Sequence, residues 1–320
     1  MRGRLGRSAV ALLVTVAGLV ALGTSALPSG AEDPTFVDWT SLLPSLSDTF
    51  DPNAANDCTA GRPTCVDKTL REMQRRFDPL ASACDRNAIF SLAYLRTTRT
   101  YEWARDQVGF FQDTPFVNHE DAVFARYYFS AVDAYQAGNA AGVPGAWQVA
   151  FDAARTRSVT GTGSLLLGMN AHVNRDLAFV LHDIGLVRLD GTSRKPDHDK
   201  VNQFLNTVVD PLLAEEAARF DPGLSQYKTA YGVGYTAFFQ QLASWREQAW
   251  RNAEALADAP TAAGRALVAQ QIEATATAQA QQIVAENQYI PFVSSAAQQD
   301  AYCAAHNGAP APQPYAYGPA

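Results

Sequence analysis

The sequence predicts an all-α fold: a single domain of about eight helices packed around a buried central helix at about residues 163–184. Apolar residues recur at the three- and four-residue spacing of amphipathic helices from about residue 66 to residue 288. Runs that alternate with a period of two, as strands would require, are scarce. The segment 163–184 is apolar on most of its sides, which is typical of a helix that its neighbours bury.

The chain begins with the pattern of a secretory signal peptide over residues 1–26. Three arginines precede an apolar run at residues 9–22, and small residues follow, so we expect cleavage after Ala26 or Ala31. The run is shorter than the roughly 20 residues that a membrane span needs. We therefore expect a secreted, extracellular protein whose mature form has no transmembrane span.

The rest of the chain divides by composition into an extension, a helical domain and a tail. Residues 27–65, rich in Pro, Ser, Asp and Asn, predict an N-terminal extension, and residues 66–305 predict the helical domain. Pro- and Ala-rich residues 306–320 predict a disordered tail. Helices are expected at 66–80, 87–106, 118–137, 144–157, 163–184, 197–220, with a break or kink at Pro211, 235–256 and 262–288.

Four cysteines, Cys58, Cys65, Cys84 and Cys303, are an even number in a chain expected to be secreted, which favours two disulfides. We favour Cys58–Cys65, which closes a short turn, and Cys84–Cys303, which ties the C-terminal end to the body of the domain. A zinc site built from all four thiolates is the alternative, although no CxxC pair is present.

Charge and motifs exclude several classes of function. The chain has 25 Lys and Arg against 32 Asp and Glu, and cleavage after Ala26 would remove three arginines and leave a net charge near −10. This balance argues against a broad nucleic-acid surface. No Gly-x-Ser-x-Gly elbow or dinucleotide fingerprint is present. The Gly-rich turn at residues 161–164 is either an anion site at a helix N-terminus or simply the start of a helix.

The central helix carries an unusual set of ionisable residues. The set has five members, and at 3.6 residues per turn they would share about a third of the helix circumference. Asn170 and Asn174 would face the opposite way, toward backbone or a neighbouring helix. Buried charges need pairing, hydrogen bonds or a metal. The stripe therefore predicts either a lined polar cavity or an internal ion-pair network; its members are His172, Arg175, Asp176, His182 and Asp183.

Four of the five histidines, His119, His172, His182 and His198, lie beside acidic residues, whereas His306 is expected at the surface. Imidazole with carboxylate is the ligand set of zinc and related ions. The i, i+4 spacing of His172 and Asp176 places both on one face of a helix, where they could chelate one ion.

Three segments carry a resemblance to a family of actinobacterial domains of unknown function. They are Phe124-Ala125-Arg126-Tyr127-Tyr128, the run Gly168-Met169-Asn170-Ala171-His172-Val173-Asn174-Arg175-Asp176-Leu177, and Val201-Asn202. The resemblance covers most of residues 66–260. It implies a shared fold and no particular activity.

The spacing His172-x3-Asp176-x5-His182 also resembles a central motif of the zinc-dependent phospholipase C and single-strand nuclease superfamily, whose members are secreted and all-helical. The resemblance implies a metal site built from Asp106, His119, His172 and Asp176, with His182 and His198 serving neighbouring sites. This chain departs from the pattern at Asn202, where an acid is expected. It also lacks the N-terminal metal-binding Trp, and no His precedes His119.

Two functional hypotheses follow. In the first, a divalent ion, with zinc favoured, activates water against a phosphoester or a lipid-like small molecule, and Asp183 or Asp106 is the catalytic base or a further ligand. In the second, the chain is a non-catalytic binding or structural module, and a hydrogen-bonded network of His172, Arg175 and Asp176 fixes helix packing. Insertion of Arg175 among the acids would favour the network, because a guanidinium neutralises them without a metal. The sequence indicates no oligomeric state.

Overall fold

The structure is a computed structural model that describes residues 49–227 and 233–320. The predicted signal peptide and most of the predicted extension lie outside the described residues. The described part is all-α and contains no strand, only isolated bridges at Val187–Ser193 and Tyr315–Gly318. The all-α prediction is therefore confirmed.

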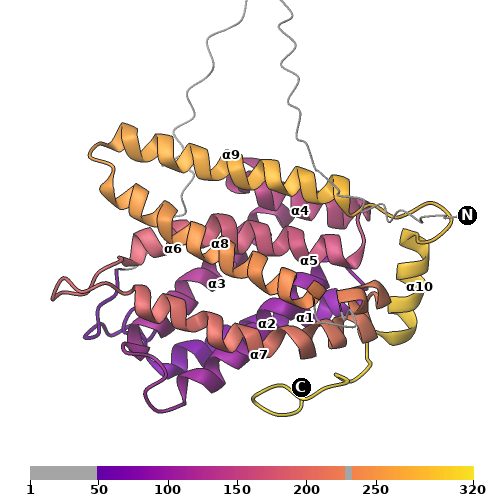
Figure 1. Cartoon of the computed structure of the whole chain (residues 1–320), viewed down its shortest axis with the longest axis horizontal. Coiled ribbons are helices and arrows are strands. Elements are labelled where there is room, and N and C mark those ends of the chain that lie inside the picture. The colour runs from indigo at the N-terminus through magenta and orange to yellow at the C-terminus, as the bar shows by residue number, and fades with distance from the viewer. Residues whose placement is uncertain (1–48, 228–232) are drawn as a thin grey trace, which may run out of the picture. The chain divides into compact units, whose positions relative to one another are not determined.

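The helices succeed one another through short connections (Figure 1). Three short helices join them: η1 (Ala140–Gly142), the π-helix η2 (Asn170–Asp176) and η3 (Pro222–Tyr227). The α-helices are α1 (Pro63–Ser82), α2 (Asn87–Arg105), α3 (Thr114–Gln136), α4 (Gly145–Thr156), α5 (Gly161–Met169), α6 (Leu177–Ile184), α7 (Lys195–Arg219), α8 (Val233–Asp258), α9 (Ala262–Glu286) and α10 (Ala296–His306).

Local sequence explains where several of these helices begin. The Asp113 carboxylate accepts a hydrogen bond from the Phe116 backbone N–H at 3.2 Å and caps α3. Thr160 caps α5, and Thr261 caps α9, through their side-chain oxygens. The break expected at Pro211 is absent, because α7 continues to Arg219 with Pro211 buried among apolar neighbours.

Helices α5, η2 and α6 form one continuous central helix, as the sequence predicts. Figure 1 shows it between α9 on one side and α1, α2 and α7 on the other. Leu165, Leu177 and Phe179 along it are at most 1% exposed. Most of its side chains are buried, and each buried polar side chain on it needs a partner inside the domain.

The structure pairs Cys58 with Cys65 and Cys84 with Cys303, with Cα–Cα distances of 5.0 and 5.9 Å. Both predicted disulfides are confirmed. The first closes a turn on α3, where the Asn118 amide donates to the Gly61 carbonyl oxygen at 2.8 Å. Gly61 has φ +63° and lies so close to Pro115 that a Cβ there would overlap the Pro115 carbonyl, so this contact requires glycine.

The structure differs from the sequence prediction at the C-terminal end. Residues 306–320 were expected to be a disordered tail, yet Tyr315 is 4% exposed and its hydroxyl donates to Glu215 on α7 at 2.7 Å. The Arg96 guanidinium lies over the Tyr315 ring at 5.4 Å. Two aromatic anchors, Tyr315 and the stacked Tyr317, thus hold a segment whose Pro and Ala content alone predicts disorder.

Candidate functional site

Five buried polar residues of the central helix lie in its π-helical turn, η2: Asn170, His172, Asn174, Arg175 and Asp176. A π turn is wider than an α turn and often marks a functional site. Just before it, Gly168 lies against the Phe90 ring, where a Cβ would approach the ring carbons to 2.2 Å. Glycine at this position therefore lets α2 and the central helix meet closely, which places Phe90 edge-on to His172 at 5.7 Å between ring centroids.

His172 and Asp176 form a buried pair at the centre of the domain. The Nδ1 atom of His172 lies 3.2 Å from Oδ2 of Asp176, and neither residue is more than 2% exposed. The same Asp176 oxygen accepts from Trp147 Nε1 at 2.8 Å, and the other accepts from Arg175 Nη1 at 2.7 Å. A carboxylate that already accepts these donors fixes the imidazole proton on Nδ1 and leaves a lone pair on Nε2.

Arg175 joins this pair to α9. Its Nε donates to Glu273 Oε1 at 2.7 Å, and its Nη2 donates to the same oxygen. The Arg175 side chain is 2% exposed, and the Phe179 ring lies 4.6 Å from its guanidinium carbon. A guanidinium between two carboxylates compensates both without a metal, so the network expected from the sequence is present at His172, Arg175 and Asp176.

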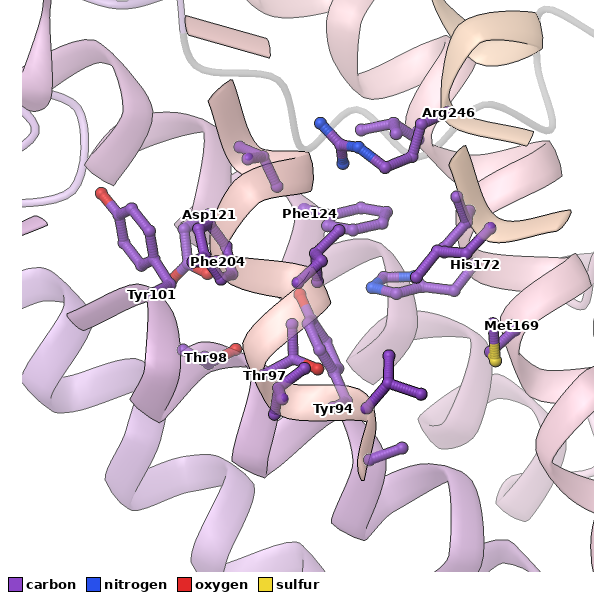
Figure 2. A pocket seen from close by; sticks show the side chains of 18 of the residues that line it. Tyr94, Thr97, Thr98, Tyr101, Asp121, Phe124, Met169, His172, Phe204 and Arg246 are labelled. Carbon is purple, nitrogen blue, oxygen red and sulfur yellow. The ribbon is translucent and has the colours of Figure 1, made fainter. Parts of the chain in front are cut away.

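A cavity of about 120 Å³ lies beside His172, between α2, α3, η2, α7 and α8. Its walls are mostly apolar. Figure 2 shows the imidazole of His172 reaching into the space between Phe124 and Tyr94. The Phe124 ring stacks on the imidazole at 3.5 Å between centroids, and the Tyr94 ring lies 4.4 Å away.

Several polar atoms of the cavity walls have no hydrogen-bond partner within residues 49–227 and 233–320. They are Nε2 of His172, the Tyr94 hydroxyl, Oγ1 of Thr98 and Oδ2 of Asp121. Burial lowers the pKa of His172, which Asp176 opposes, so neutral imidazole is favoured. Buried polar atoms are nearly always hydrogen-bonded, and such a group of orphans beside one cavity indicates a site for a ligand or for water.

Two carboxyl groups of α3 also line the cavity. Burial raises the pKa of Glu120 to about 7, and burial together with the nearby Glu120 charge raises the pKa of Asp121 to about 8. Arg246 lies across the cavity on α8, and burial lowers its pKa to about 10. Perturbed groups that gather at a cavity are typical of functional sites, although ion-pair networks produce them too.

The other residues predicted for a metal site lie away from His172. His119 Nδ1 lies 2.8 Å from the Cys58 carbonyl oxygen, so it contacts the disulfide turn. His198 and Asn202 both contact Arg246: Arg246 Nη2 donates to the His198 carbonyl oxygen at 2.7 Å, and its Nε donates to Asn202 Oδ1 at 2.9 Å. A cation thus occupies the position where the superfamily resemblance would place a second metal.

The remaining predicted residues are nearer the surface. His182 Nδ1 lies 3.1 Å from its neighbour Asp183, whose other oxygen accepts from the Tyr127 hydroxyl at 2.5 Å. Asp106 is 63% exposed and pairs with Arg105 at 2.8 Å. Of the seven residues predicted for catalysis or metal binding, the structure brings together His172 with Asp176 and His182 with Asp183. In the described ranges no three His, Cys, Asp or Glu side chains form a group suited to a metal ion.

Sequence reasoning missed the partners that come from distant helices. Glu273 on α9 and Trp147 on α4 complete the His172 pair, but neither stands at a helical spacing from it. Phe124 lies in one of the segments that carry the family resemblance, and this resemblance is the sequence signal that points to it. The predicted roles of Asn170 and Asn174 are confirmed: they bond to the Ala276 carbonyl oxygen and to the Gln279 side chain of α9.

Among the described residues, no helix is both long enough and apolar enough to cross a membrane. No curated protein and no solved structure matches the chain. Residues 66–286 match the family of unknown function DUF5995, and because this match covers more than half of the chain, the chain belongs to that family.

Proposed function

We propose that the domain is a binding module whose cavity takes a small, mostly apolar molecule that carries a hydroxyl group. The observation that carries this proposal is the orphaned Nε2 of His172, held as an acceptor by Asp176 on the other side of the ring. A ligand hydroxyl would donate to this nitrogen and accept from the Tyr94 hydroxyl, which also lacks a partner among the described residues. The apolar walls would bury the rest of the molecule.

The size of the cavity sets the scale of the ligand. Its volume of about 120 Å³ is close to that of an engineered protein cavity of roughly 150 Å³ that binds benzene. A single ring or a short branched chain would fit without movement of the helices.

The test compares p-cresol with toluene, which differ by one hydroxyl, by isothermal titration of the purified chain. We expect p-cresol to bind about tenfold more tightly, the effect of about one hydrogen bond to a buried acceptor. The variant His172→Phe keeps a ring against Phe124 and removes Nε2, so it should abolish this preference. His182→Phe, at a partly exposed histidine of the same helix, is the matched control. Failure of both probes to bind, or equal binding by both, would contradict the proposal.

A metal-dependent hydrolase acting on phosphoesters or lipids is the second candidate. Its support is that a carboxylate on Nδ1 with a free Nε2 is the arrangement of many metal-ligating histidines. It needs at least two further ligands near Nε2. Metal analysis after titration with zinc and with manganese tests it: about one bound equivalent, lost in His172→Phe, is required, and less than about a tenth excludes a single-site mechanism.

We also propose that the protein is secreted. The two disulfides are typical of proteins that mature in an oxidising compartment, and the N-terminal pattern of the sequence is that of a signal peptide. Recovery of the chain from culture medium, with an N-terminus at residue 27 or 32, tests this.

A further inference from the structure

A second concave site lies apart from the His172 cavity and shares no lining residue with it. This groove of about 820 Å³ runs between the start of α5, η3, the end of α9 and the start of α10. Hydroxyl and amide side chains dominate its lining, including Thr160, Asn287, Ser295 and Gln298. Its volume falls within the range of ligand-binding clefts.

Two residues that line the groove, Tyr289 and Gln299, belong to a hydrogen-bonded series of polar groups that also includes Arg86, which does not line it. Arg86, 3% exposed, pairs with Asp300 at 2.6 Å and donates to the Tyr289 hydroxyl at 3.4 Å. Tyr289 in turn donates to Oε1 of Gln299 at 2.7 Å. Gln299 is 5% exposed, and its Nε2 has no hydrogen-bond partner in the described part of the chain. This hydrogen-bonded series therefore ends at the Nε2 donor of Gln299 beside the groove, and such a donor suits an acceptor oxygen of a ligand.

The charges of the groove exclude an anionic ligand. Among residues 49–227 and 233–320, no Lys, Arg or His lines it, whereas Asp221 and Glu286 do. The N-terminus of α5, which the sequence offered as a possible anion site, already has an internal carboxylate. Asp221 Oδ2 accepts from the Gly161 N–H at 2.7 Å, and its Oδ1 accepts from the Gly223 N–H at 2.9 Å. A phosphate or carboxylate would meet an internal carboxylate there.

Aromatic and apolar surface completes the lining. Tyr289 and Tyr302 are both partly exposed in the groove, and Tyr302 stacks on His306 at 4.1 Å, which fixes its ring. Ile290 and Val293, 61% and 70% exposed, stand at its rim. Aromatic rings present a flat apolar face with a polar edge, which matches the alternating faces of a sugar ring.

We infer that this groove binds a neutral saccharide. Hydroxyl and amide groups can each donate and accept, which suits a ligand that carries many hydroxyls. The Nε2 of Gln299 would donate to one ring or hydroxyl oxygen, and the rings of Tyr289 and Tyr302 would contact the apolar face of a sugar. The inference is independent of the function proposed for the His172 cavity.

The experiment titrates the purified chain with cellohexaose, maltohexaose, xylohexaose and chitohexaose, and reads binding by saturation-transfer NMR and calorimetry. We expect at least one to bind with a dissociation constant below about 1 mM. Gln299→Glu keeps an oxygen to accept from Tyr289 and replaces the Nε2 donor with an acceptor. It should weaken binding about tenfold, the effect of about one hydrogen bond.

Gln248→Glu, the same substitution at an exposed position of α8, is the matched control and should bind like the parent chain. Circular dichroism and a thermal melt of Gln299→Glu show whether it remains folded, and Tyr302→Ala offers a second route to the same loss if it does not. The inference is overturned if none of the four oligosaccharides binds, if binding is unchanged in both groove variants, or if inorganic phosphate competes for the site.

Discussion

Nδ1 of His172 and Oδ2 of Asp176 lie 3.2 Å apart inside a largely buried π turn, and Arg175 donates to the same carboxylate. Replacement of Arg175 by a neutral residue would leave the Asp176 and Glu273 carboxylates buried without their cation. Truncating one side of such a pair removes its compensation, which makes buried ion pairs sensitive to single changes.

Asp176→Asn should lower the free energy of unfolding by roughly 1–3 kcal/mol, because the amide N–H₂ would face the N–H donor of Trp147 or of Arg175 and leave buried donors without an acceptor. Urea denaturation measures this. Asp133→Asn removes the carboxylate of an ion pair with Arg76 whose Asp133 side chain is 57% exposed, and should cost less than about 1 kcal/mol. Equal losses in the two variants would show that the buried network carries no special weight.

Stability should fall as the pH rises from about 6.5 to about 8; below this range the lowered pKa values of the buried His172 and His198 act in the opposite direction. Burial raises the pKa of Asp121 to about 8 and that of Glu120 to about 7, so the folded chain holds protons that the unfolded chain has already lost in this window. The charged groups that act on Asp121 are Glu120, Arg105 and Glu102. When the folded state binds more protons, the free energy of unfolding decreases with pH.

Asp121→Asn removes a carboxyl that binds a proton in the folded state, so the free energy of unfolding should depend less on pH. At pH 8 the variant should be more stable than the parent chain by at least about 1 kcal/mol. Chemical denaturation at each pH unit from 5 to 8 gives the profile. Asp106→Asn, at a largely exposed carboxyl, should leave the profile as it is. A parent profile that rises between pH 6.5 and pH 8 would refute the assignment of protonated carboxyls to the cavity.

The sequence predicts the fold well for two reasons. Helical periodicity depends on residues that are near one another in the sequence, and four cysteines allow only three disulfide pairings. The pairing of His172 with Asp176 is also local, since i, i+4 residues meet on a helix. The five ionisable residues of the predicted stripe do not form one group, because η2 is a π turn and their predicted positions assume 3.6 residues per turn. His182 therefore contacts Asp183, and Asp183 accepts from the Tyr127 hydroxyl, nearer the surface.

The rest of the site depends on contacts between helices that are far apart in sequence. Glu273 is 98 residues from Arg175, and Arg246 is 48 residues from His198. Composition cannot assign these partners, because acids and arginines occur along the whole chain. The exception is Arg175 itself: a cation within an acidic stripe indicates an ion-pair network rather than a metal site, and its contacts with Asp176 and Glu273 agree with that interpretation.

Loss of the Cys84–Cys303 disulfide should destabilise the domain more than loss of Cys58–Cys65. The first closes a sequence separation of 219 residues and the second one of 7, and a crosslink restricts the unfolded chain more when its loop is longer. Cys84→Ser with Cys303→Ser should cost roughly 2–5 kcal/mol in the free energy of unfolding. The double variant of Cys58 and Cys65 is the control, and a larger loss there would mean that the disulfide turn on α3, rather than chain entropy, dominates.

Tyr315→Phe should loosen the C-terminal segment without unfolding the domain. The Tyr315 hydroxyl donates to Glu215, which also accepts from Arg96 and Arg219, so the carboxylate keeps two cationic partners when the hydroxyl is lost. We expect a loss of about 1 kcal/mol for this variant, and of roughly 3–5 kcal/mol for Tyr315→Ala, which also vacates a buried ring position. Hydrogen exchange over residues 308–320 separates the two outcomes: protection that is low in the parent chain and unchanged by either substitution would mean that this segment is not anchored in solution.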